Sequence, residues 1–273
     1  MPKYIDYNIS QLRPYINWLY FYFAWGLSGK PQEEKDKLKA EADAMLDIFE
    51  ARYHTHAAFG LFEANGDMDD IVIGDTRMPM LRQQRKADDG EPNMCLADFV
   101  RPLSQGIPDH IGVFATSIDS AVEHDFCDDD FQRMLAQTLA DRLAEATTER
   151  MHEEVRRTYW GYAPHERFTK EQLFREEFQG IRPSVGYPSL PDTSVNFLLD
   201  SLLDMKSIGI RLTESGAMQP HASVTGLMFA HPQARYFDLG KIGSDQFLDY
   251  ARRRGVPVEL MRRFLASSLA PQT

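Results

Sequence analysis

The feature that most constrains this chain is a run of three prolines and two glycines between Gly180 and Asp192, which reads GIRPSVGYPSLPD. Each proline fixes its own φ at about −65° and biases the residue before it towards extended conformations. Neither a helix nor a central strand can therefore continue through the run. The run is predicted to be a stiffened loop, and a loop that is already ordered loses less entropy when it holds a ligand.

Arg182 is the one cationic side chain of this loop. A guanidinium can bind a carboxylate or phosphate through two parallel hydrogen bonds, for about 1.5–3 kcal/mol. The loop would then be an anion-binding element of a small-molecule site. The competing interpretation is a structural crossover with a surface arginine, because turn chemistry alone explains every glycine and proline.

Charge and cysteine content exclude several classes of protein. A net charge of −11 over 273 residues argues against a nucleic-acid surface or an anionic membrane surface, since both require basic stripes. The N-terminus has no apolar signal-peptide region, and the apolar run Trp18–Leu27 is too short for a spanning helix of about 20 residues. Cys95 and Cys127 alone build neither a disulfide framework nor a cysteine-rich zinc site, which fits a reducing cytoplasm.

Helical and strand patterns arrive in blocks. Apolar spacing, caps and breakers predict helices over 9–25 (a helix or helix-turn), 31–53, a long segment after Asp125–Asp130, 169–178, 192–203, 244–255 and a short one from Pro257. Strands are predicted over 57–64 and 71–75, joined at Asn65-Gly66 by a solvated turn, and over 111–116, 210–214, 223–230 and 235–242. This order indicates an α+β class with a mostly antiparallel sheet.

No nucleotide-binding glycine motif, serine elbow or zinc-protease motif is present, so no catalytic or metal-binding residue is predicted. On the long helix, one face carries charged and polar residues at steps of three and four, namely Asp141, Glu145, Glu149, His152 and Arg156. Such a stripe is usually solvated. Glu145 becomes a candidate binding residue if its helical face meets the Arg182 loop. Its carboxylate would then bind a cationic group of the ligand beside the anion-binding guanidinium.

Many short blocks at consistent spacing carry a resemblance to one family. They are Tyr15–Trp18, Cys95–Val100, Asp141–Glu145, Tyr159–Glu166, Gly180–Pro183 with Gly186–Pro188, Leu212–Ser215 with Ala217–Met218, Ala222–Gly226, His231–Pro232, Tyr236–Phe237 and Asp249–Arg253. In this order, and over essentially the whole chain, they resemble the activation domain of cobalamin-dependent methionine synthase.

The resemblance implies one C-shaped domain over residues 1–273, with a twisted antiparallel sheet flanked by helices. It also implies a repair function, in which the domain presents S-adenosylmethionine to oxidised cobalamin carried by a partner protein. An electron from a flavodoxin-like donor and the sulfonium methyl then restore methylcobalamin. The domain positions groups and supplies no nucleophile or base, so independent turnover is not expected.

The same resemblance implies the binding residues. Arg182 would hold the ligand carboxylate, and the backbone from Ser184 through Gly186 to Tyr187 would line the adenosine and methionine parts. Tyr187 would also approach the corrin. Tyr236 and Phe237 match a second ligand-contacting segment, and Glu145 and Glu176 match acidic positions that favour the ammonium or sulfonium. For these aromatic and acidic side chains, packing or solvation is the competing interpretation.

Two departures from the family pattern stand out. Asn17 replaces an aspartate that helps to bind the ligand's amino group, and the segment Ser189–Thr193 lacks the usual cysteine and histidine. The chain also has no D-x-H-x-x-G cobalamin motif, so we expect a free-standing subunit that acts in trans on a cobalamin-binding methionine synthase chain. The alternatives are a reactivator or sensor for another corrinoid protein, and an independent methyltransferase, which would need an acceptor site.

Overall fold

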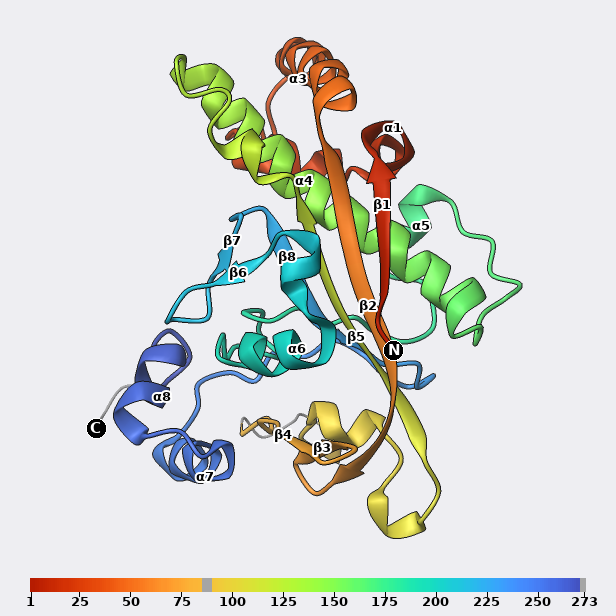
Figure 1. Ribbon diagram of the computed structural model, residues 1–273, viewed down its shortest axis with the longest axis vertical. Helices are drawn as coiled ribbons and strands as arrows, with labels where there is room; N and C mark the ends of the chain where they lie inside the picture. The colour runs from red at the N-terminus through yellow and green to blue at the C-terminus, as the bar shows by residue number, and fades with distance from the viewer. Residues whose placement is uncertain (85–89, 271–273) are drawn as a thin grey trace.

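The structure is a computed structural model that describes residues 1–84 and 90–270 (Figure 1). The helices are α1 (Ile9–Leu12), α2 (Trp18–Ala24), α3 (Gln32–Arg52), α4 (Asp130–Glu154), α5 (Lys170–Phe174), α6 (Val195–Leu203), α7 (Ser244–Arg254) and α8 (Val258–Phe264). The strands are β1 (Lys3–Asn8), β2 (His54–Asp67), β3 (Asp70–Ile73), β4 (Thr76–Pro79), β5 (Asp109–Ile118), β6 (Arg211–Leu212), β7 (Met218–Gln219) and β8 (Ser223–Met228). No helix within these two ranges is long and apolar enough to cross a membrane.

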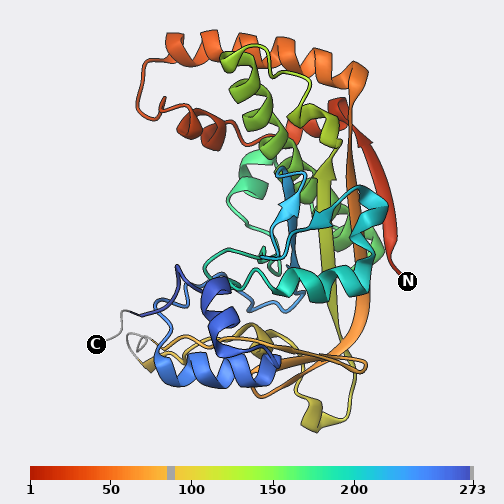
Figure 2. The same cartoon turned by 60° about the vertical axis from the view of Figure 1, so that its left-hand side comes forward.

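One curled antiparallel sheet forms the spine of the molecule. Its strands follow the order β4-β3-β2-β5-β8, and β1 pairs with the first half of β2. β2 and β5 are paired along most of their length, from Thr55 opposite Ile118 to Ala64 opposite Asp109. Figure 2 shows this spine with α2 and α3 projecting from one end and α7 with β3 and β4 from the other. The predicted C-shaped α+β fold is confirmed.

Helices cover both faces of the sheet. Successive residues of a strand point to opposite faces. On β2, Phe59 joins the core that contains α4 and the N-terminal helices, whereas Ala58 joins the core that contains α6, α7 and α8. On β5, Phe114 joins the same core as Phe59, and Val113 joins the same core as Ala58. The central strands are therefore apolar on both sides.

The longest helix forms as predicted after the acidic run. The carboxylate of Asp129 caps α4 by accepting a hydrogen bond from Gln132 N at 2.8 Å. Leu135, Leu139 and Leu143 are buried at the predicted spacing. Because this apolar stripe packs against the sheet, the acidic stripe beside it is held at a fixed orientation.

The predicted hairpin of β2 and β3 exists, but its turn lies elsewhere. Asn65 and Gly66 are inside the ladder, and the chain reverses at Met68-Asp69, where Met68 has a φ of 57°. A Cβ at Gly66 would lie 2.6 Å from the carbonyl oxygen of Ala97. Gly66 therefore permits a close backbone approach, and this tertiary requirement overrides the local turn preference.

Other local predictions are also wrong. Asp70, predicted in a solvated turn, is 6% exposed and pairs with Arg77 and Arg253. Segment 235–242 forms no regular strand. The capping box at Thr169 is present, but its helix α5 ends at Phe174, short of 178. Segment 9–25, predicted as a helix or helix-turn, is divided: α1 continues into a 3₁₀ turn at Arg13–Tyr15, the backbone is extended at Ile16, and α2 begins after Asn17.

Candidate functional site

The Pro/Gly run lies along the free edge of β8. Ile181 exchanges two backbone hydrogen bonds with Phe229, at 3.0 and 2.9 Å, and Leu227 N donates to the carbonyl oxygen of Pro183 at 3.0 Å. Proline lacks an N–H, so it is tolerated at an edge where only its carbonyl is used. The loop is thus extended and tied to the sheet, and this fixes the backbone of Arg182 between Ile181 and Pro183.

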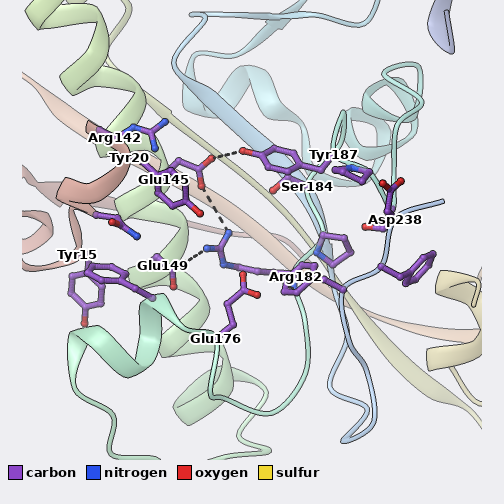
Figure 3. A pocket seen from close by; sticks show the side chains of 17 residues that line it. Tyr15, Tyr20, Arg142, Glu145, Glu149, Glu176, Arg182, Ser184, Tyr187 and Asp238 are labelled. Carbon is purple, nitrogen blue, oxygen red and sulfur yellow. Dashed lines mark hydrogen bonds and ion pairs between the residues drawn. The ribbon is translucent and has the colours of Figure 1, made fainter. Parts of the chain in front are cut away.

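A cavity of about 670 Å³ lies between this loop, α2, α4 and segment 236–238 (Figure 3). Its walls are formed by Tyr15, Asn17, Tyr20, Arg142, Glu145, Glu149, Phe174, Glu176, Arg182, Pro183, Ser184, Tyr187, Pro188, Ser189, Tyr236, Phe237 and Asp238. Every residue predicted for ligand binding contributes to these walls except Gly186, which lies at the tip of the loop with a φ of 91°. Their binding roles stay predictions.

Arg182 is 9% exposed and faces the acidic side of α4 (Figure 3). Its guanidinium pairs with Glu149 and lies 4.0 Å from Glu145, which precedes Glu149 by one helical turn. Burial disfavours the charged guanidinium, but the attraction of Glu149, Tyr236 and Glu145 outweighs it and raises the pKa of Arg182. The guanidinium therefore remains protonated throughout the physiological range.

Sequence reasoning missed Glu149 as a site residue, although it makes the direct ion pair with Arg182. A signal was present, because Glu149 follows Glu145 at a spacing of four on the same helical face. Tyr15, Tyr20, Arg142 and Phe174 were also missed. These four come from separate segments, and their meeting depends on the tertiary fold.

Two tyrosines bind to this cluster, one at the backbone of Arg182 and the other at the carboxylate of Glu145. The hydroxyl of Tyr236 accepts a hydrogen bond from Arg182 N at 3.0 Å, and burial raises the pKa of Tyr236 to about 12. Tyr187 is 54% exposed and donates to Glu145 at 3.1 Å, and that carboxylate, with burial, raises the pKa of Tyr187 to about 12. Both are neutral phenols at pH 7. Phe237, by contrast, is 9% exposed and belongs to the core on the α7 side.

Asn17 and Glu176 occupy the cavity wall in different ways. The Oδ1 atom of Asn17 accepts a hydrogen bond from Leu19 N at 3.1 Å and thereby caps α2. Glu176 has a φ of 57°, which is an unfavourable backbone conformation for glutamate. Although much of Glu176 is open to solvent, desolvation beside the cavity raises its pKa.

The wall therefore combines both signs of charge. Carboxylates come from Glu145, Glu149, Glu176 and Asp238, and guanidiniums from Arg142 and Arg182. A small molecule that carries a carboxylate and at least one cationic centre matches this arrangement, and Ser184, 7% exposed, adds polar groups from the loop.

Two comparisons with known proteins agree with the geometry. Residues 8–255 match the family described as vitamin B12 dependent methionine synthase, activation domain. The chain is also similar to a crystal structure of the MetH reactivation domain bound to AdoHcy, with a TM-score of 0.93 and 38% sequence identity. That similarity covers 100% of this chain and 91% of the other.

Proposed function

Because the chain belongs to the family of vitamin B12-dependent methionine synthase activation domains, we propose that its cavity binds S-adenosylmethionine and supports the reductive remethylation of oxidised cobalamin on methionine synthase. The observation that carries the proposal is the buried Arg182 between carboxylates of α4. S-adenosylmethionine carries one carboxylate, one ammonium and one sulfonium, which are the charges that this wall complements. The similar reactivation domain was crystallised with AdoHcy.

Every predicted residue except Asn17 has a role in this proposal. Arg182 binds the carboxylate, and the loop backbone from Ser184 to Tyr187 contacts the rest of the ligand. Glu145 and Glu176 favour the cationic centres, since opposite charges attract strongly where solvent is partly excluded. Tyr236, with Phe237 behind it, offers an aromatic surface suited to the adenine or sulfonium.

The chain's own groups bind and orient the ligand and transfer no proton. Cobalamin bound to the partner, once reduced by one electron from a flavodoxin-like donor, would supply the acceptor for the sulfonium methyl, and S-adenosylhomocysteine would be the leaving group. Orienting the sulfonium methyl towards that acceptor is the contribution that the cavity makes to the rate.

An exposed apolar surface beside the cavity is evidence that the chain binds a macromolecular partner. On α2, Leu19, Tyr20 and Phe23 are 69%, 58% and 70% exposed, and Tyr20 also lines the cavity. Exposed apolar patches mark interaction sites. We propose that this patch contacts the methionine synthase chain that carries cobalamin. This chain would then act in trans on that partner, in the cytoplasm.

Calorimetric titration with S-adenosylmethionine tests the binding proposal. We expect wild-type binding and a loss of at least about tenfold in Arg182→Gln, because a charge-assisted contact contributes about 1.5–3 kcal/mol. Thermal melting shows whether the variant is folded. An unchanged affinity in folded Arg182→Gln would contradict the assigned role. If a binding-competent chain failed to reactivate methionine synthase, the alternative would be favoured, namely a reactivator or sensor for another corrinoid protein.

A further inference from the structure

The ion pair between Arg182 and Glu149 leaves two polar atoms without a partner. Nη2 of Arg182 contacts Oε1 of Glu149, but Nε of Arg182 and Oε2 of Glu149 have no hydrogen-bond partner within the described residues. The two side chains are only 10% and 12% exposed. Buried polar atoms in native proteins are almost always bonded, and an optimal guanidinium–carboxylate pair forms two parallel bonds. Two residues of the cavity wall, Arg182 and Glu149, therefore keep a buried donor and a buried acceptor that no other group uses.

Asn17 is poorly suited to bind a ligand ammonium in this chain. Its Oδ1 atom already accepts from Leu19 N and carries no formal charge, and its other polar group is an NH₂ that can only donate. An ammonium also has only donors. A carboxylate would therefore bind the amino group of an amino-acid ligand more strongly than this amide does.

We infer that Glu149 supplies this carboxylate, and that Arg182 and Glu149 together form a subsite for the α-amino-acid end of the ligand. The inference rests on the proposed function. In an α-amino acid the ammonium and the carboxylate are attached to one carbon, so a guanidinium and a carboxylate side by side match both charges at once. The ligand ammonium donates to Oε2 of Glu149, and the ligand carboxylate binds the guanidinium of Arg182.

The other glutamates of the wall are less suited to this role. Glu145 already accepts from Tyr187 at 3.1 Å, and its side chain is 28% exposed. Glu176 is more exposed than either Glu145 or Glu149. Charge interactions weaken with exposure, so the 12% exposed Glu149 offers the strongest attraction to an ammonium. Glu145 and Glu176 remain available to the sulfonium.

Binding of two ligands shows whether Glu149 recognises the ammonium or only holds Arg182 in place. One is S-adenosylmethionine, and the other is its des-amino analogue, in which hydrogen replaces the amino group. The measured quantity is the ratio of the two dissociation constants, des-amino over parent, which reports the contribution of the amino group. In the wild type we expect a ratio on the order of 10 to 100.

Glu149→Gln keeps the shape and removes the charge, so the ratio should fall to within about threefold of unity. Glu149→Asp keeps the charge and should give an intermediate ratio. Glu154→Gln is the control, because Glu154 lies on the same helix, pairs with Arg150 and does not line the cavity. It should leave the ratio unchanged.

If Glu149→Gln kept the wild-type ratio of the two dissociation constants, the inference would be overturned. This holds whether the variant binds both ligands more weakly or more tightly than the wild type does. Equal weakening would mean that Glu149 only supports Arg182, and equal tightening that it only competes with the ligand carboxylate. Failure of the wild type to bind S-adenosylmethionine would instead refute the proposed function, and the inference with it.

Discussion

Replacing Gly226 by alanine should displace the loop that carries Arg182. Gly226 lies on β8 where the loop crosses, and a Cβ there would be 2.3 Å from the carbonyl oxygen of Pro183 and 2.8 Å from the ring of Phe114. Neither neighbour is a flexible side-chain end. The loop must therefore move away from the strand.

The magnitude follows from what that movement breaks. Two backbone hydrogen bonds hold the loop here, Leu227 N to Pro183 O at 3.0 Å and Val185 N to Thr225 O at 2.9 Å. Their loss costs about 1–3 kcal/mol together, and overpacking adds about 1–3 kcal/mol. The free energy of unfolding should fall by about 2–6 kcal/mol, measured by urea denaturation. Affinity for S-adenosylmethionine should fall as well, because Arg182 directly precedes Pro183.

Gly60→Ala is the matched control. Gly60 lies on β2 in the same sheet, but the nearest atoms to its added Cβ all belong to the side chain of Phe62, which can rotate. This variant should lose less stability and keep the affinity. Gly226→Ala would refute this reasoning if it had the same stability and affinity as the wild type, or the same as Gly60→Ala. The position of the loop would then not depend on its close contact with β8.

Three further predictions test other parts of the site and the sheet. Asn17→Asp should tighten S-adenosylmethionine binding severalfold in calorimetry, because one oxygen can still cap α2 while the other adds a negative charge. Tyr236→Phe should lower the free energy of unfolding by about 1–3 kcal/mol in urea, because the N–H of Arg182 loses its acceptor. His56→Gln should lower the melting temperature more at pH 5.5 than at pH 9. Burial opposes the charge of His56, but hydrogen bonds to Asp6 and Asp119 outweigh it and raise the pKa of His56 above 6.5. The stabilisation that His56 gives to the folded state is therefore complete below pH 6.5 and is lost as the pH rises through its folded-state pKa.

Local chemistry was sufficient to predict several elements. Three prolines exclude regular structure between Gly180 and Asp192, and the loop is where the sequence places it. The cap at Asp129 and the leucine stripe of α4 are likewise local, so that helix was predicted with its buried face. The family resemblance added the residues that meet across the cavity, which no spacing argument could bring together.

The errors arise where tertiary contacts override local preference. Asn65-Gly66 favours a turn, but Gly66 is needed where the backbone at Ala97 comes close. Segment 235–242 has the composition of a strand, yet its backbone meets the loop instead, through Leu239 N and Pro188 O at 3.3 Å. β1 was missed because its partner, β2, begins some fifty residues later.

Glu149 shows the same limit within the site. Its place on the acidic face of α4 was visible in the sequence, but its contact with Arg182 depends on how the loop runs along β8. A charged stripe becomes a binding surface only when another element covers it. The sequence alone does not show which glutamate is covered most.

The measurement that tests the central claim most directly is methylcobalamin formation in trans. A cobalamin-loaded methionine synthase fragment without an activation domain would be reduced in the presence of S-adenosylmethionine, with and without this chain, and followed by the visible spectrum of the corrinoid. We predict that methylcobalamin forms only when the chain is present, and that Arg182→Gln abolishes its formation. Equal rates with and without a chain that binds S-adenosylmethionine would contradict the proposed function.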